Sequence, residues 1–358
     1  DEKNMILLGF IGFLDPPKES AKSAIQKLNR AGIRVIVLTG DNAEVTECIC
    51  KKVGINSKNI VQGNQIENLA DAGVLRLLKK NTVIRNIFKL GFPGTEEELS
   101  KNINKKNSIT IIAAPTGEGK TTTLYSIIDY LNRPQINITT IEDPVEIRID
   151  GLNQIEVDAK ASFSSSLRTV LRQDPDIILV GEIRDRETAE IAMQAGQTGH
   201  YVLSTIHTID SIEVITRLRK MGMSKYDISS ILATSVSQRL VRKICPYCAK
   251  ERDFTDKEKE IINKIGEKYN TKFDFKGKKT YEPVGCKKCN QSGYLNRIGI
   301  FEVLNIDDEV RDLIARDGSS MEIRAKALEL GYKPLVIDGL KKVLNGITTL
   351  DEINNKLI

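Results

Sequence analysis

The sequence has no long hydrophobic run and no strong excess of charge of either sign. No stretch reaches the about 18 consecutive apolar residues that a membrane-spanning helix needs. The apolar run at residues 5–14 is short and follows acidic residues, so it does not fit a signal peptide either. The 53 basic and 48 acidic residues leave a formal net charge of +5, which gives no indication of nucleic-acid binding. We therefore expect neither a membrane span nor a nucleic-acid partner.

The chain is long enough for two or three domains. Its 358 residues, 40% hydrophobic and 28% charged, have the composition of an ordinary globular protein. Apolar runs of strand length alternate with helical patterns near the amino terminus and again from residue 108 onward, which predicts an α/β fold class. The predicted strands include residues 136–141, 177–182 and 201–205, and the predicted helices include residues 96–102, 163–173, 187–197, 308–315, 321–330, 335–344 and 350–357.

The clearest local pattern is the run ITIIAAPTGEGKTTT at residues 109–123. A short apolar strand leads into a loop in which Gly117 and Gly119 allow the backbone to turn its N–H groups toward an anion. The following helix adds unpaired N–H donors at its start. This order predicts a phosphate-binding loop in which Lys120 reaches the outer phosphates and the Thr121 hydroxyl binds Mg²⁺. The other predicted nucleotide contacts are Pro115, Thr116, Glu118 and Thr122.

Two residues of this run depart from the usual pattern. Ala114 stands where the pattern has glycine, and Glu118 places a carboxylate on a loop that binds anionic phosphates. Because like charges repel, we expect Glu118 to point to solvent. The alternative interpretation is an ordinary loop before a helix that happens to contain Gly-x-Gly-Lys.

Carboxylates follow the next two predicted strands. The first strand runs into Glu142, Asp143 and Glu146, which suit Mg²⁺ or an attacking water, and a solvated turn is the alternative. The second is a buried apolar strand that closes on Glu182, which we expect to hold Mg²⁺ through water or to activate the nucleophile. The carboxyl ends of parallel strands meet at one edge of a sheet, so these residues should gather beside the phosphate-binding loop.

Histidine and arginine supply the remaining candidates. The only two histidines, His200 and His207, stand at the two ends of the predicted strand at residues 201–205. A lone histidine favours a structural role, but these two accompany the other polar clusters, and we expect them to belong to the site. Arg168 and Arg172 are spaced i, i+4 on a predicted helix, so their guanidinium groups share one face, which is either solvated or turned toward phosphate.

Together these motifs resemble those of the secretion ATPases of type IV pilus assembly and type II secretion, over about residues 95–358. The matching segments are Walker A at 114–125, the aspartate box at 141–146, the Walker B region at 171–185, the histidine box at 199–208, and downstream segments at 238–242 and 293–294. The resemblance implies a RecA-like P-loop NTPase core, a homohexamer, and ATP hydrolysis coupled to pilin or pseudopilin polymerisation. It also implies a cytoplasmic location at the inner face of the cytoplasmic membrane, with an inner-membrane platform protein as partner.

The same resemblance implies roles for individual residues. Glu182 is the implied main catalytic carboxylate, while Glu142 and Glu146 would order Mg²⁺ or water. His207, with His200, would sense the γ-phosphate. The arginines Arg168 and Arg172 would face nucleotide across a subunit interface. One departure is Ile209, which stands where the family usually has asparagine after His-Thr.

Four of the six cysteines form two pairs, Cys245-x-x-Cys248 and Cys286-x-x-Cys289. Two such knuckles at this separation suit tetrahedral Zn²⁺ held by thiolates on tight turns, and free thiols are the alternative. All four positions are cysteine, which leaves no open coordination place. We therefore predict a structural zinc site, and the resemblance supports the same interpretation.

A different resemblance precedes the core. Residues 13–19 and 37–42 resemble the phosphorylation domain of P-type cation-transporting ATPases, an HAD-like αβ unit, which occupies the place of the secretion ATPases' own N-terminal domain. The motif Asp-Lys-Thr-Gly-Thr with its phosphorylated aspartate is absent from the sequence, which excludes a cation pump. The expected organisation is a partial phosphorylation-domain-like segment with linker (1–82), a linker (83–107), the RecA-like core (108–240), a four-cysteine zinc subdomain (241–300) and a C-terminal helical region (301–358).

Two functional hypotheses follow. The first is an ATP-hydrolysing motor of pilus assembly or secretion that uses ATP and Mg²⁺ and holds structural Zn²⁺. The second is an ATP- and zinc-binding fusion fragment without turnover. A measurement of ATP hydrolysis distinguishes them.

Overall fold

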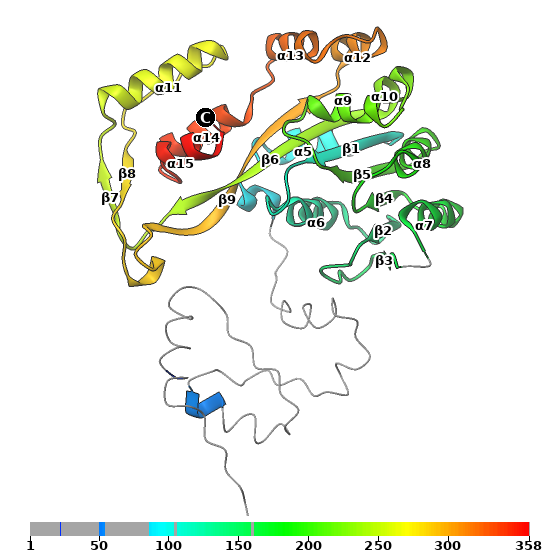
Figure 1. The fold of residues 1–358 in the computed structure, drawn as a ribbon, viewed down its shortest axis with the longest axis horizontal. Coiled ribbons are helices and arrows are strands. Elements are labelled where there is room, and N and C mark those ends of the chain that lie inside the picture. Colours follow the sequence, from blue (N-terminus) through cyan, green and yellow to red (C-terminus); the bar gives the residue numbers. More distant parts are fainter. Residues whose placement is uncertain (1–21, 23–49, 54–85, 104–105, 159–160, 358) are drawn as a thin grey trace, which may run out of the picture. The chain divides into compact units, whose positions relative to one another are not determined.

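The computed structural model describes residues 22, 50–53, 86–103, 106–158 and 161–357 (Figure 1). The chain divides into two units, Asp1–Leu78 and Lys79–Ile358. In the first unit the described residues, Lys22 and Cys50–Val53, are helical, and the strands predicted for that unit lie outside the described residues. Among the residues with described structure, no helix has both the length and the apolar character to cross a membrane.

The second unit is built on a seven-stranded sheet with the order β3-β2-β4-β5-β1-β6-β9. The strands are β1 (Ser108–Ala113), β2 (Ile138–Glu142), β3 (Asn153–Glu156), β4 (Ile177–Val180), β5 (Tyr201–Ile206), β6 (Leu232–Ile244) and β9 (Tyr294–Asn305). Neighbours from β3 to β6 pair in parallel, and β9 runs antiparallel to β6. Strands β1, β2, β4 and β5 are buried along their whole length, as expected for a parallel sheet covered on both faces. The predicted α/β class is confirmed.

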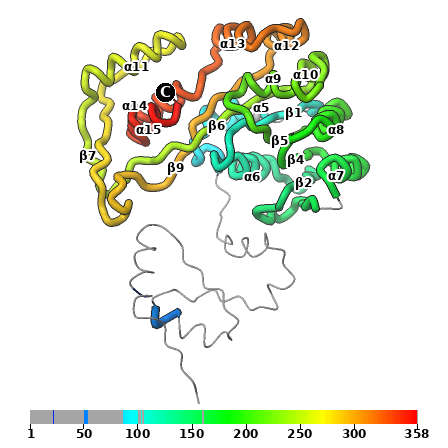
Figure 2. Tube along the Cα trace, viewed as in Figure 1, coloured from blue at the N-terminus to red at the C-terminus, as the bar shows by residue number. Residues whose placement is uncertain are grey.

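Helices cover both faces of this sheet (Figure 2). One face packs against η1 (Ile87–Leu90), α5 (Glu96–Ile103) and α6 (Lys120–Leu131). The other packs against α7 (Phe163–Val170), α8 (Arg186–Gln197), α9 (Glu213–Lys220) and α10 (Lys225–Ile231). Successive residues of β1 point to opposite faces, so Ile111 joins the core on the α8 side and Ile112 joins the core on the α6 side.

The predicted helix at residues 163–173 is divided in two. It is helical to Val170 and then tightens into the 3-10 helix η2 (Leu171–Gln173), which ends at Asp174 in a left-handed conformation with φ of 48°. The four helices predicted at the carboxyl end are confirmed to within one residue. They are α12 (Asp308–Ala315), α13 (Ser320–Glu329), α14 (Leu335–Leu344) and α15 (Leu350–Leu357).

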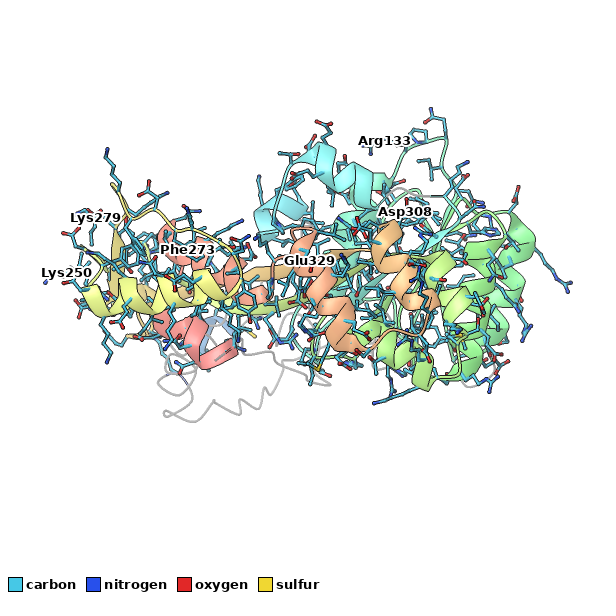
Figure 3. The ribbon with its side chains drawn as sticks, turned by 90° about the horizontal axis from the view of Figure 1, so that it is seen from above. Arg133, Lys250, Phe273, Lys279, Asp308 and Glu329 are labelled. Atoms are coloured by element: carbon cyan, nitrogen blue, oxygen red, sulfur yellow. The ribbon has the colours of Figure 1, made fainter. Side chains whose placement is uncertain are left out.

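An extension leaves the sheet through β6 and β9. It contains the antiparallel pair β7 (Ala249–Arg252) and β8 (Thr280–Pro283), with α11 (Asp256–Lys268) between them in sequence. Figure 3 shows this extension, marked by Lys250 and Lys279, at the end of the unit away from Arg133. Its residues Phe254 and Ile262 pack in a third core with α14 and α15.

The predicted subdomain boundaries after residues 240 and 300 fall inside strands. β6 and β9 pair continuously from Thr234 with Asn305 to Arg242 with Arg297. The central sheet and the cysteine-bearing extension therefore share two long strands.

Candidate functional site

The predicted phosphate-binding loop lies between β1 and α6. It spans Ala114 to Gly119, and α6 begins at Lys120. Gly117 and Gly119 have φ of +80° and +84°, a left-handed conformation that favours glycine. A side chain at Gly119 would also crowd β6, because its Cβ would lie 3.2 Å from Nε2 of Gln238. The loop therefore has the backbone shape that an anion cradle needs.

Lys120, the first residue of α6, turns its side chain back toward this loop. Its Nζ donates hydrogen bonds to the carbonyl oxygens of Ala114 at 2.8 Å and Pro115 at 3.3 Å, and it lies 3.2 Å from Nδ1 of His207. Burial lowers the pKa of Lys120, the Glu182 carboxylate opposes part of this shift, and the Arg239 guanidinium adds to it. The ammonium group is thus held where an anion on the loop would meet it.

The other predicted loop contacts border the same place. Pro115, Thr116 and Thr122 are exposed, and Thr121 is half-buried at the start of α6. Exposed side chains and backbone at a helix start leave room for a ligand on this side of the loop.

Glu182 follows β4 and faces the loop across His207. Nε2 of His207 lies 2.8 Å from Oε1 of Glu182, and the Glu182 side chain is only 13% exposed. Arg184 donates from Nε to the other carboxylate oxygen at 2.7 Å, and its NH1 lies 3.4 Å from Oδ2 of Asp143. The hydrogen bond to Glu182 is the largest cause that raises the pKa of Arg184. Lys120, His207 and Glu182 thus form one continuous polar series.

A cavity of about 310 Å³ borders this series. It is lined by Glu182, Ile183, Arg184, Ile206, His207 and Arg217. Sequence reasoning did not select Arg184 or Arg217 as site residues, although Arg184 stands two residues after Glu182 and Arg217 lies on the helix that follows His207. Both segments follow strands of the same parallel sheet, so the direction of the strands places them at its carboxyl end. This pattern could have identified Arg184 and Arg217 as site residues.

The aspartate-box residues take two different positions. Glu142 is buried, and its carboxylate accepts hydrogen bonds from the Tyr125 hydroxyl, from Oγ1 of Thr140 at 2.6 Å and from Nε2 of Gln154 at 3.2 Å. Glu146 is exposed. Protein donors engage both oxygens of Glu142, so in this structure its carboxylate links β2 to α6 and β3. The predicted role of both glutamates toward Mg²⁺ or water stays a prediction.

Three predicted residues lie apart from this group. His200 precedes β5 and is buried, with its Nδ1 3.0 Å from the carbonyl oxygen of Ala195. Because β5 is parallel to β1, this position is at the sheet edge opposite the phosphate-binding loop. The expectation that both histidines share one site is therefore corrected within this chain.

Arg168 is exposed near Glu187 at 3.6 Å, and Arg172 is exposed in η2, so their contact with nucleotide across a subunit interface stays a prediction.

Glu118 does not point to solvent as expected. Its Oε2 accepts a hydrogen bond from the Leu240 backbone N–H at 2.5 Å, and its Oε1 lies 3.3 Å from Nζ of Lys356 on α15. The neighbouring carbonyl oxygen of Glu118 accepts from Nε2 of Gln238. Donors thus engage both oxygens of the carboxylate, which explains how an acidic residue is tolerated on this loop. A second cavity, of about 340 Å³, adjoins this contact and is lined by Gly117, Glu118, Leu240, Arg242, Arg297, Glu352, Asn355 and Lys356.

Replacing Glu118 with alanine should lower the free energy of unfolding by about 1–3 kcal/mol, because the partly buried Leu240 N–H loses its charged acceptor. Urea unfolding followed by circular dichroism measures this change. The matched control is Glu118→Gln, which keeps an acceptor oxygen for Leu240 and removes only the charge that faces Lys356. Equal stability of the alanine variant and the parent would contradict the prediction.

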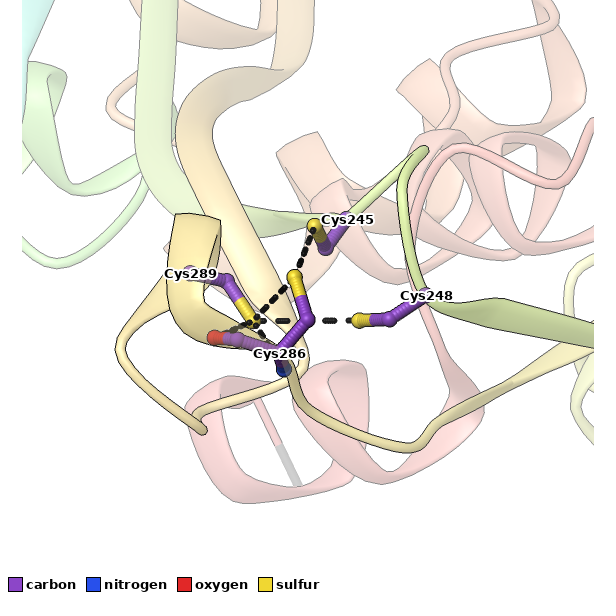
Figure 4. A group of neighbouring side chains, drawn as sticks. All are labelled: Cys245, Cys248, Cys286 and Cys289. Carbon is purple, nitrogen blue, oxygen red and sulfur yellow. Dashed lines mark hydrogen bonds between the residues drawn. The ribbon is translucent and has the colours of Figure 1, made fainter.

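The four paired cysteines come together at the base of the extension (Figure 4). Their sulfur atoms all lie within 4.8 Å of one another, with Sγ–Sγ distances of 3.9 Å for Cys245 and Cys286, 3.7 Å for Cys248 and Cys289, and 3.7 Å for Cys286 and Cys289. Four sulfurs about 2.3 Å from a tetrahedral zinc ion lie about 3.8 Å apart. Backbone N–H groups of Cys286 and Gly293 donate to the Cys289 sulfur, which favours a thiolate there. The cluster therefore fits a metal ion of this type.

Two protein-family models match this chain, one over its amino-terminal part and one over most of the remainder. The family model described as type II/IV secretion system protein matches residues 67–355, and the model described as haloacid dehalogenase-like hydrolase matches residues 2–113. The type IV pilus assembly ATPase PilB of Thermus thermophilus is 44% identical over 286 residues, which cover 79% of this chain and 32% of that protein. Type II secretion system protein E of Dickeya dadantii is 42% identical and covers 80% of this chain and 56% of that protein.

Two solved structures share the fold of this chain. The crystal structure of the pilus retraction motor PilT with bound ADP is 28% identical, with a TM-score of 0.57, and covers 76% of this chain and 67% of that chain. The ATPase DotB of Legionella pneumophila, 23% identical with a TM-score of 0.54, shares the fold over 76% of this chain and 64% of that chain. The chain spans between about a third and somewhat over half of the length of the two curated relatives described above.

Proposed function

This chain belongs to the type II/IV secretion system protein family, and from that premise we propose that it is an ATP-hydrolysing motor of type IV pilus assembly or type II secretion. The observation that carries the proposal is the polar series Lys120–His207–Glu182 beside a glycine-shaped loop. A cation beside the phosphate-binding loop and a shielded carboxylate that can orient water are parts that enzymes use to transfer a phosphoryl group to water.

Each residue has a task in this reaction. The loop N–H groups and the Lys120 ammonium would hold the outer phosphates and stabilise the charge that develops on them. Glu182 would orient a water molecule and take its proton as the oxygen attacks the γ-phosphorus and the bond to the ADP oxygen breaks. His207, with its Nε2 hydrogen directed at Glu182 and its Nδ1 at Lys120, would keep both groups in place. Mg²⁺, which the Thr121 hydroxyl would help to hold, neutralises charge on the phosphates when bound.

The four cysteines would hold a structural zinc ion outside this reaction. All four ligands come from the protein, which leaves no position for a substrate or water. The ion would fix the ends of β6 and β9 where the extension begins.

The larger assembly is also part of the proposal. By analogy with the pilus assembly ATPases to which the chain is similar, we expect a homohexamer that works at the inner face of the cytoplasmic membrane with a platform protein of the pilus or secretion machine. The subdomains would be those expected from the sequence, with the ATPase core and the cysteine extension joined by β6 and β9. Arg168 and Arg172, exposed on one subunit, would then contact nucleotide held by its neighbour.

A second function has an observation in its favour. The haloacid dehalogenase-like match at residues 2–113 overlaps the start of the secretion match at residues 67–355. The alternative is a fusion fragment that binds ATP and zinc without turnover.

Replacing Lys120 with alanine should lower ATP turnover by at least about 100-fold, because a cation that stabilises transition-state charge is removed. The measurement is steady-state phosphate release by the purified chain, with its mass determined by light scattering in the same sample. Lys220→Ala, a change at an exposed lysine on α9, is the matched control and should leave turnover unchanged. Turnover by a hexamer that is lost in Lys120→Ala supports the motor, whereas ATP binding by a chain that shows no turnover above that variant favours the fragment.

A further inference from the structure

Tyr125 is a buried tyrosine in the helix that starts with Lys120. Its side chain is 2% exposed, and its hydroxyl donates to Oε2 of Glu142. The same hydroxyl accepts hydrogen bonds from the backbone N–H groups of Glu146 at 3.1 Å and Ile147 at 3.4 Å. One side-chain oxygen of α6 therefore links the Glu142 carboxylate, which directly precedes the segment 143–147, to the backbone at the carboxyl end of that segment.

The segment 143–147 has only a small number of other polar contacts in the described structure. Gln154 on β3 donates to the Ile147 carbonyl oxygen at 3.0 Å, and Glu156 accepts from the Val145 N–H at 3.2 Å. These contacts come from the edge strand of the sheet. Tyr125 is the contact that ties the segment to the phosphate-binding helix.

The segment in turn reaches the predicted catalytic carboxylate. Asp143, at its start, lies 3.4 Å from Arg184, and Arg184 donates to Glu182 at 2.7 Å. Glu182 contacts His207, and His207 contacts Lys120 at the start of α6. The contacts thus close a ring that leaves α6 at Tyr125 and returns to it at Lys120.

We propose that Tyr125 is a positioning residue for Glu182, acting through the segment 143–147 and the Asp143–Arg184 pair. This inference rests on the proposed ATPase function. Burial and the adjacent Glu142 carboxylate raise the pKa of Tyr125, so its hydroxyl keeps the proton that it donates. Loss of the hydroxyl leaves Glu142 without one donor and two backbone N–H groups without their acceptor. The segment would then shift, and Arg184 and Glu182 would shift with it.

Replacing Tyr125 with phenylalanine tests the proposal, because it removes the hydroxyl and keeps the ring. We expect kcat for ATP hydrolysis to fall by about 10- to 100-fold, the effect of a small misplacement of a catalytic group. KM for ATP should stay within about twofold, because the phosphate-binding loop is unchanged. Tyr201→Phe is the matched control. Tyr201 is also buried, and its hydroxyl donates to Oγ1 of Thr110 at 3.0 Å, but it starts β5 at the opposite sheet edge.

Hydrogen exchange supplies a second readout that does not depend on activity. The backbone amides of Glu146 and Ile147 should exchange faster in Tyr125→Phe and at the parental rate in Tyr201→Phe. A parental kcat in Tyr125→Phe, or equal losses of kcat in the two variants, would overturn the proposal. If the parent chain shows no turnover, the proposed function fails, and exchange alone decides: faster exchange of these amides supports the positioning contact, and unchanged exchange overturns it.

Discussion

Replacing Glu182 with glutamine is expected to lower kcat for ATP hydrolysis by about 1,000-fold while ATP still binds. Glutamine has nearly the same shape, but it cannot take a proton from water, and one of its two positions becomes an N–H donor. That donor would face either His207 or Arg184, both of which now donate to the carboxylate. Phosphate release measures turnover, and displacement of a fluorescent ATP analogue measures binding in the same preparation.

A matched glutamate is available away from the site. Glu329 at the end of α13 is exposed and lies 2.7 Å from Lys326, so Glu329→Gln removes the same charge without touching the polar series or Arg168. It should retain parental turnover. If Glu182→Gln hydrolysed ATP at a rate close to the parent, another carboxylate would have to accept the proton, and the exposed Glu146 would be the next one to test.

Replacing Cys245 with serine is expected to remove bound zinc and to unfold the extension. Structural zinc contributes about 10–16 kcal/mol of apparent binding free energy in small zinc-dependent domains, which here would stabilise two short strands and one helix. Cys245 is fully buried directly after β6, so its loss also disturbs the point where the extension joins the sheet. Zinc per chain, measured by mass spectrometry of the metal, should fall from one to zero, and trypsin should cut residues 249–283 more rapidly.

A cysteine outside the cluster provides the control. Cys50→Ser changes a buried thiol in the other unit and should leave the zinc content at one per chain. A parent chain that binds no zinc under reducing conditions, with unchanged proteolysis in Cys245→Ser, would argue against the metal site and in favour of free thiols.

The parts of the site that a sequence can predict are those carried by adjacent residues. The phosphate-binding loop was predictable because one strand, two glycines and one lysine follow each other within a few positions. The terminal helices were predictable for the same reason: Ser319 and Glu322, for example, form a capping box at the start of α13. The cysteine cluster was predictable because each of its two C-x-x-C pairs is local in the sequence.

Contacts between distant segments could not be predicted in this way. Glu118 was expected in solvent because its partners, Leu240 and Lys356, lie more than a hundred residues further along the chain. Tyr125 was not singled out in the sequence, although a buried tyrosine hydroxyl needs a partner. The error at His200 has a different origin, since the two ends of one strand necessarily lie at opposite edges of a parallel sheet.

The contact between Glu118 and α15 has a practical use. Asn355 is exposed, lines the same cavity as Gly117 and Glu118, and takes no part in the polar series around Glu182. A fluorophore attached to a cysteine introduced there would sit next to the phosphate-binding loop without altering any predicted nucleotide contact. The last helix therefore offers a reporter position from which occupancy of the loop could be followed in real time.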